Sequence, residues 1–156
     1  KITLILVGKT DKKYIIDGIA EYEKRLMHYC KFEIKVIPDI KNTKAMSADV
    51  QMQREGEQIV GLLRPSTETI LLDERGREYT SVELARFIER KGVAGQSDLT
   101  FVVGGPYGFS QELKGIAKSM VSLSKLTFSH QLVRLLFVEQ LYRAMTIIKG
   151  EPYHHE

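Results

Sequence analysis

Strand-like and helix-like segments alternate along the whole chain, and this alternation constrains the fold more than any other feature of the sequence. Five short runs rich in Val, Ile and Leu have strand character: 2–8, 32–38, 68–73, 98–104 and 121–127. Five amphipathic segments with apolar residues at helical spacing follow them: 13–29, 47–63, 81–91, 110–119 and 130–149. Repeated strand–helix units favour parallel strands. The sequence therefore predicts an α/β fold with a mostly parallel five-stranded sheet and helices on both faces.

Capping residues support several of the expected helix starts. Thr80 and Glu83 have the spacing of a capping box. Three serines stand where a side-chain oxygen can cap a first turn: Ser47, Ser110 and Ser129.

Composition and charge narrow the class of protein. The chain has no apolar run long enough to cross a bilayer. Its one cysteine, Cys30, cannot form an internal disulfide, which is typical of a reducing cytoplasm. A net charge of +3 permits a polyanionic partner without indicating one, and the basic runs 9–13 and 41–44 are best interpreted as solvated loops. With no repeat or linker, residues 1–156 are expected to form a single cytoplasmic domain.

Glycines and a proline follow the fourth strand directly, in the segment FVVGGPYGFS (101–110). Ligands of open parallel sheets bind at the carboxyl ends of strands, and Gly104 and Gly105 allow a ligand to approach the backbone. The loop matches neither the phosphate-binding nor the dinucleotide fingerprint. Taken alone, it fits a tight turn and a ligand loop equally well.

Two other strand ends supply neighbours for this loop. The third strand ends in LLDERG (71–76), and LSKLTFSH (123–130) ends the fifth. Together the three ends predict a crevice rich in backbone donors and acceptors, which suits a nucleoside. No metal site is expected, because metal-ligand spacing is absent among the four histidines, His28, His130, His154 and His155.

The last expected helix is apolar around nearly its whole circumference, which requires neighbours on two sides. It is either a central helix of the monomer or a helix that packs on the sheet and on a second subunit; we expect the second. Arg134 shares the face of His130 and needs a partner, either in a structural salt bridge or at the crevice or subunit boundary. Arg143 and Glu139 have the spacing of an exposed helix ion pair.

Four separated motifs resemble the ribosomal RNA large-subunit methyltransferase H family of the SPOUT class. They are LLDERG, VVGGPYGFS, SLSKLTFSHQLVRLLFVEQLYRA and the terminal PYHHE; ITLILVGK and EGEQI (55–59) are similar too. The resemblance implies a C-terminal trefoil knot, an exception to the rule that chains do not knot. It further implies a homodimer that uses S-adenosyl-L-methionine to methylate N3 of a pseudouridine in 23S rRNA of the assembled ribosome.

Site residues follow from the same resemblance. It implies cofactor contacts at Leu72, Gly105, Leu123, Ser124, Lys125, Leu126, Thr127 and Phe128. It implies catalytic, RNA-side residues at His130, Arg143, Tyr153, His154 and His155. The chain departs from its relatives at His155, where related tails commonly carry Arg or Lys, so this phosphate contact depends on pH.

The chemistry leaves alternatives open. The imide N3 of a pseudouridine must lose a proton, and His130, His154, His155 or solvent can take it. Without the resemblance, the tail would be interpreted as a frayed terminus. A non-catalytic ribosome- or RNA-binding module of the same fold is the alternative function, and a different α/β enzyme acting on a nucleotide is a third.

Overall fold

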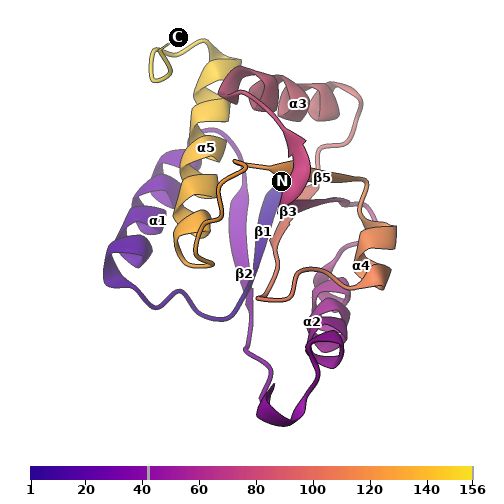
Figure 1. The fold of residues 1–156 in the computed structure, drawn as a ribbon. Coiled ribbons are helices and arrows are strands. Elements are labelled where there is room, and N and C mark those ends of the chain that lie inside the picture. The colour runs from indigo at the N-terminus through magenta and orange to yellow at the C-terminus, as the bar shows by residue number, and fades with distance from the viewer. Residues whose placement is uncertain (42, 156) are drawn as a thin grey trace.

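The computed structural model describes residues 1–41 and 43–155 and confirms the expected α/β architecture (Figure 1). Five parallel strands form one sheet in the order β2-β1-β4-β3-β5. The strands are β1 (Ile2–Val7), β2 (Phe32–Ile37), β3 (Glu68–Glu78), β4 (Leu99–Val103) and β5 (Ser119–Ser122). The helices are α1 (Lys13–Leu26), the 3-10 turn η1 (Thr43–Ala45), α2 (Ala48–Leu62), α3 (Ser81–Val93), α4 (Gln111–Ile116) and α5 (Leu132–Lys149). Asn42 in the basic run 41–44 and Glu156 in the tail lie outside the described residues.

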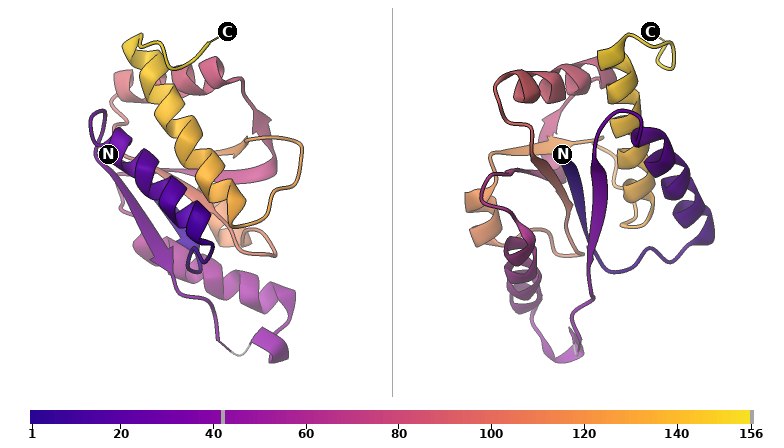
Figure 2. Two further views of the ribbon diagram at one scale, coloured as in Figure 1. Left: turned by 90° about the vertical axis from the view of Figure 1, so that its left-hand side faces the viewer. Right: turned by 180° about the vertical axis from the view of Figure 1, so that it is seen from behind.

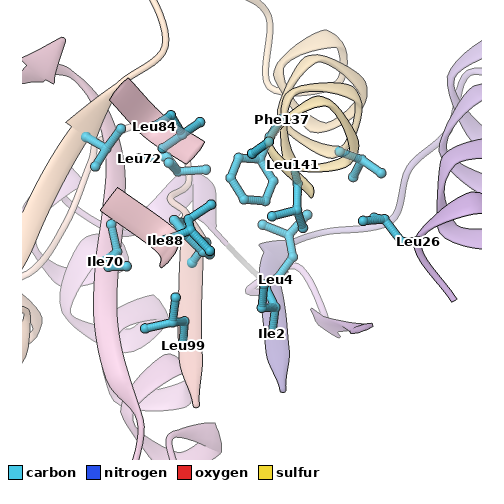
Figure 3. Packing of buried hydrophobic residues seen from close by; sticks show 14 of the residues in the cluster. Ile2, Leu4, Leu26, Ile70, Leu72, Leu84, Ile88, Leu99, Phe137 and Leu141 are labelled. Carbon is cyan, nitrogen blue, oxygen red and sulfur yellow. The ribbon is translucent and has the colours of Figure 1, made fainter. Parts of the chain in front are cut away.

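Helices cover both faces of the sheet, as expected (Figure 2). Successive strand residues point to opposite faces, so β1 sends Leu4 to the cluster beneath α1, α3 and α5 and Ile5 to the cluster beneath α2 and α4. Figure 3 shows Phe137 and Leu141 of α5 packed above the first of these faces. Apolar clusters thus cover both faces of the sheet, and the loops that follow the strands lie at its carboxyl edge.

β5 is shorter than the sequence predicted and ends at Ser122, so the expected strand 121–127 was wrong beyond that residue. Serine side chains replace the ladder there: Ser122 Oγ donates to the carbonyl of Ser124 at 2.8 Å, and Ser124 Oγ accepts from the Leu126 amide at 3.0 Å. Such local side-chain bonds compete with strand pairing. Residues 123–128 are consequently a loop.

β3 is longer than expected, because it continues past residue 73 to Glu78. Its pairing with β5 shifts register between Leu72 and Arg77, so the intervening residues leave the regular ladder. Gly76 permits the close approach of the two strands, since a Cβ at this position would lie 2.6 Å from the Met120 backbone. Leu72 thus remains the last residue of the regular part of β3.

α5 lies on the sheet between α1 and α3, and none of its residues 132–148 is exposed (Figure 2). These two helices of the same chain supply the neighbours that its broad apolar surface requires. The second subunit that we expected at α5 stays a prediction. No described helix combines the length and hydropathy of a membrane span.

The expected caps are present. Thr80 and Glu83 form the full capping box. The hydroxyl of each of the three capping serines accepts a hydrogen bond from the backbone N–H three residues later: Ser47 from Val50, Ser110 from Leu113 and Ser129 from Leu132.

Candidate functional site

A pocket of about 460 Å³ opens at the carboxyl ends of β4, β3 and β5, which are adjacent in the sheet. Three segments form its walls: 72–75 in the irregular part of β3, the loop 103–109, and the loop 123–128 apart from Lys125, with His130 and Val133 near the start of α5. The volume lies within the range of small-ligand sites. The crevice expected from the three strand ends is therefore present as a cavity.

The glycine loop presents backbone to this pocket. Gly108 has φ +85°, a conformation that side chains rarely allow, and its N–H donates to the Gly105 carbonyl at 3.2 Å. A Cβ on Gly104 would lie 2.9 Å from the ring of Phe109. The loop is thus folded tightly on itself, and small residues are required by its own packing.

The loop after β5 is joined to the irregular part of β3 by a side-chain hydrogen bond. Thr127 Oγ1 donates to Glu74 Oε2 at 2.7 Å, and both residues line the pocket. Asp73, beside Glu74, is bound by Arg75 through two side-chain contacts and one backbone contact, and these bonds lower the pKa of Asp73. Polar contacts therefore hold residues 73–75 in place at the pocket wall.

Glu55 of α2 lies directly behind the glycine loop and was not recognised as a site residue from the sequence. Its side chain is buried, and a Cβ on Gly105 would lie 2.4 Å from its Oε1. Gln51 Nε2 donates to Oε2 at 3.2 Å, whereas Oε1 has no hydrogen-bond partner among the described residues. Burial raises the pKa of this carboxyl group. The signal in the sequence was a glutamate four residues before Ile59 on the buried stripe of α2.

Arg134 is buried and holds the turn after β1 in place. Its guanidinium donates to the carbonyls of Val7, Gly8 and His130 at 2.8–2.9 Å and to the Thr10 hydroxyl at 3.0 Å. Burial lowers the pKa of Arg134. Of the two alternatives left open for Arg134, the salt bridge is absent among the described residues, because carbonyl oxygens and a hydroxyl take the place of a carboxylate. By bonding the His130 carbonyl, Arg134 also fixes the backbone at the edge of the pocket.

The tail packs against α5 and is not frayed. Arg143 donates to Glu139 through Nε and Nη2, at 3.0 and 2.7 Å, and its Nη1 lies 3.2 Å from Nδ1 of His154. The guanidinium lies over the ring of Tyr153, 4.7 Å from the centroid. Burial and the contact with Tyr22 raise the pKa of Tyr153 to about 12. The pair of Arg143 and Glu139 is therefore a partly buried cluster, where the sequence predicted an exposed ion pair.

Comparison with known proteins gives a family. Residues 1–154 match the model of a family described as predicted SPOUT methyltransferases. The chain belongs to this family. It is also 53% identical over 156 residues to the "Ribosomal RNA large subunit methyltransferase H" of Parabacteroides distasonis, covering 100% of this chain and 99% of the relative. Proteins of the same name from Porphyromonas gingivalis and Bacteroides fragilis are 51% and 50% identical at the same coverage. The resemblance inferred from the motifs is thus confirmed.

In this SPOUT methyltransferase family member, seven of the eight residues expected to contact a cofactor line one pocket: Leu72, Gly105, Leu123, Ser124, Leu126, Thr127 and Phe128. Lys125 does not; its Nζ lies 3.6 Å from Glu78 Oε1 at an exposed position.

The residues expected to act on RNA fall into two groups. His130 lines the pocket, whereas Arg143, Tyr153 and His154 gather at the other end of α5. Arg143 is three turns beyond Leu132, about 17 Å along the axis at 1.5 Å per residue. His155 is exposed beyond them. Within one chain, the tail and the pocket do not form one site. No group of His, Cys, Asp or Glu suited to a metal occurs in the described part of the chain.

Proposed function

We propose that this chain is an S-adenosyl-L-methionine-dependent methyltransferase acting on N3 of a pseudouridine in 23S rRNA of the assembled ribosome. The relatives that match it over its full length are named as methyltransferases of large-subunit ribosomal RNA. The observation that carries the proposal is the single pocket that gathers the three strand-end loops. We further propose that residues 1–156 act as one cytoplasmic domain.

The residues of the pocket fit this cofactor. Apolar side chains of Leu72, Val103, Phe109 and Leu123 provide walls for an adenosine, and the glycine loop provides backbone groups at close range. A side chain at Gly105 would collide with the Glu55 carboxyl group behind the loop, so glycine lets the loop keep its position at the pocket wall. When bound, S-adenosyl-L-methionine supplies a methyl group activated by its sulfonium. The work of the chain is to hold the donor, orient the acceptor and accept its proton.

Among the three candidate histidines, His130 is the best proton acceptor. It is exposed and lies at the lip of the pocket, and Arg134 fixes its backbone. The contact with Arg143 fixes the tautomer of His154. Because the guanidinium can only donate, Nδ1 of His154 accepts the hydrogen bond and Nε2 carries the ring hydrogen. In this tautomer His154 can donate to an RNA oxygen but has no free acceptor nitrogen.

A homodimer would unite the two groups of site residues. Because the tail cluster and the pocket lie at opposite ends of α5, an isologous pairing of two chains can bring each tail to the partner's pocket. Tyr153 would then supply an aromatic surface, and Arg143 a fixed positive charge, beside the ribosomal RNA. No membrane or metal partner is part of the proposal.

The proposal is tested by methyl transfer from S-adenosyl-L-methionine carrying a tritiated methyl group. Ribosomes that lack the modification, free rRNA and nucleotides are offered separately. We expect label in ribosomes and little in the other two. Binding of the cofactor without transfer to any substrate would favour a non-catalytic module, and transfer to nucleotides would indicate a different enzyme.

A further inference from the structure

Glu55 places an acidic group directly behind Gly105, a residue of the pocket wall. Its side chain is 3% exposed, and its Oε1 and Oε2 would lie 2.4 and 2.7 Å from a Cβ on Gly105. Gly105 lines the pocket and has no side chain, so only backbone separates the carboxyl group from the cavity. A ligand against Gly105 therefore lies within a few ångströms of this acid.

The negative charge of Glu55 has no cationic partner in the described residues. No Lys, Arg or His lies within ion-pair distance of it there, and its one hydrogen bond comes from the neutral amide of Gln51. The titratable groups that face it from other elements are Asp39, which adds to the negative field, and His130, whose effect is the opposite. The nearest buried cation, Arg134, is bonded to carbonyls and a hydroxyl.

Other acids at the pocket differ in this respect. Asp73 is paired with Arg75 at 3.0 Å, and Glu74, which accepts from the neutral Thr127 hydroxyl, is exposed to solvent. A buried carboxylate that is left unpaired is costly unless something else stabilises its charge. A cationic ligand on the other side of Gly105 would do so.

We propose that the Glu55 carboxylate is a specificity determinant of the pocket, which makes it prefer a cationic ligand over its neutral counterpart. This inference rests on the proposed function, in which the donor is a sulfonium and the product is a neutral thioether. Glu55 strengthens binding of S-adenosyl-L-methionine relative to S-adenosyl-L-homocysteine. After methyl transfer the attraction to the sulfur is lost, which favours release of the product.

The test is calorimetric titration of both compounds into the wild type and three variants. Glu55→Gln and Glu55→Met each remove the charge with little change in volume, and two such variants are made because either replacement can disturb folding. Glu57→Gln is the matched control, because it makes the same change at an exposed position of the same helix. Thermal unfolding shows which variants fold, and one folded neutral variant is sufficient.

We expect neutral replacement at Glu55 to weaken S-adenosyl-L-methionine binding about tenfold, which corresponds to about 1.4 kcal/mol. Binding of S-adenosyl-L-homocysteine should change less than about twofold, and Glu57→Gln should change neither, because a screened surface charge has little effect. Equal losses for both compounds, or no loss, would overturn the inference and leave the proposed function intact. A wild type that binds neither compound would instead refute the proposed function.

Discussion

Replacing Gly105 with alanine should separate a structural role of the glycine loop from a binding role. The new Cβ would lie 2.4 Å from Glu55 Oε1, about 1 Å inside the 3.4 Å at which ordinary contact begins. Either the carboxyl group or the loop must therefore move. Glu55 is 3% exposed and its Oε2 is held by Gln51, so the carboxyl group has little free space into which it can turn. We expect the loop to move, which displaces the wall of the pocket.

The magnitude follows from this displacement. Overpacking of a tight site costs about 1–3 kcal/mol, and loss of the hydrogen bond from Gln51 would add about 1 kcal/mol if the carboxyl group also shifted. We expect the free energy of unfolding to fall by about 1–2 kcal/mol. The affinity for S-adenosyl-L-methionine should fall at least about 30-fold, roughly 2 kcal/mol, because the backbone contacts depend on the position of the wall.

Urea unfolding and calorimetric titration measure the two quantities on the same preparations. Gly61→Ala in α2 is the control, because nothing lies within 4 Å of its Cβ, and a helical Gly→Ala change should stabilise by about 0.5–1 kcal/mol. In the double variant Gly105→Ala with Glu55→Ala, the clash is removed, so the two stability losses should not add. A folded Gly105→Ala protein with wild-type affinity would refute the placement of the cofactor.

Four further predictions concern the tail, the dimer, the buried Arg134 and the partly buried Asp98. Deleting residues 153–156 should leave S-adenosyl-L-methionine affinity within about twofold and abolish methylation of ribosomes; loss of cofactor binding would place the tail in the cofactor pocket. Light scattering should give twice the mass of one chain, whereas a stable monomer at working concentration would refute the dimer. Arg134→Met should destabilise the protein by about 2–4 kcal/mol in urea unfolding, since three carbonyls lose their donor and stay buried. A change below about 1 kcal/mol would contradict the role of Arg134 in holding the turn after β1. The hydrogen bond from Arg64 is the main cause that lowers the pKa of Asp98 in the folded protein. The carboxylate therefore adds stability that is present above its unfolded pKa and is lost as the pH falls through the lower folded pKa. Asp98→Asn should accordingly lower the free energy of unfolding by about 1 kcal/mol near pH 7 and by almost nothing near pH 2.

Much of the fold could be predicted from the sequence because local patterns determine it. Alternating apolar runs and helical spacing gave the five strands and the helices on both faces, and the capping residues at Thr80 and Ser47 marked helix starts accurately. The error in the fifth strand lies where side-chain hydrogen bonds to the neighbouring backbone override strand propensity. The run 121–127 has strand character, but Ser122 and Ser124 turn its backbone into the pocket wall.

The loops that form the pocket were predicted from the sequence, whereas the buried side chains behind these loops were not. Glycine-rich and strand-end motifs mark the pocket directly, whereas Glu55 contributes through a contact with Gly105 that no spacing in the sequence reveals. Likewise, the hydrogen bonds from Arg134 to backbone carbonyls cannot be predicted from the sequence, because every residue carries a carbonyl group. The separation of the tail cluster around Arg143 from His130, by about three turns of α5, became evident only once the tail was placed.

The central claim is tested most directly by identifying the product on the RNA. Ribosomes lacking the modification are incubated with the protein and S-adenosyl-L-methionine, and the nucleosides of the 23S rRNA are separated and analysed by mass spectrometry. The account predicts one new methylated pseudouridine carrying the methyl group at N3, formed with wild type and greatly reduced with His130→Asn. Methylation of another base, or no methylated nucleoside from protein that binds the cofactor, would contradict it.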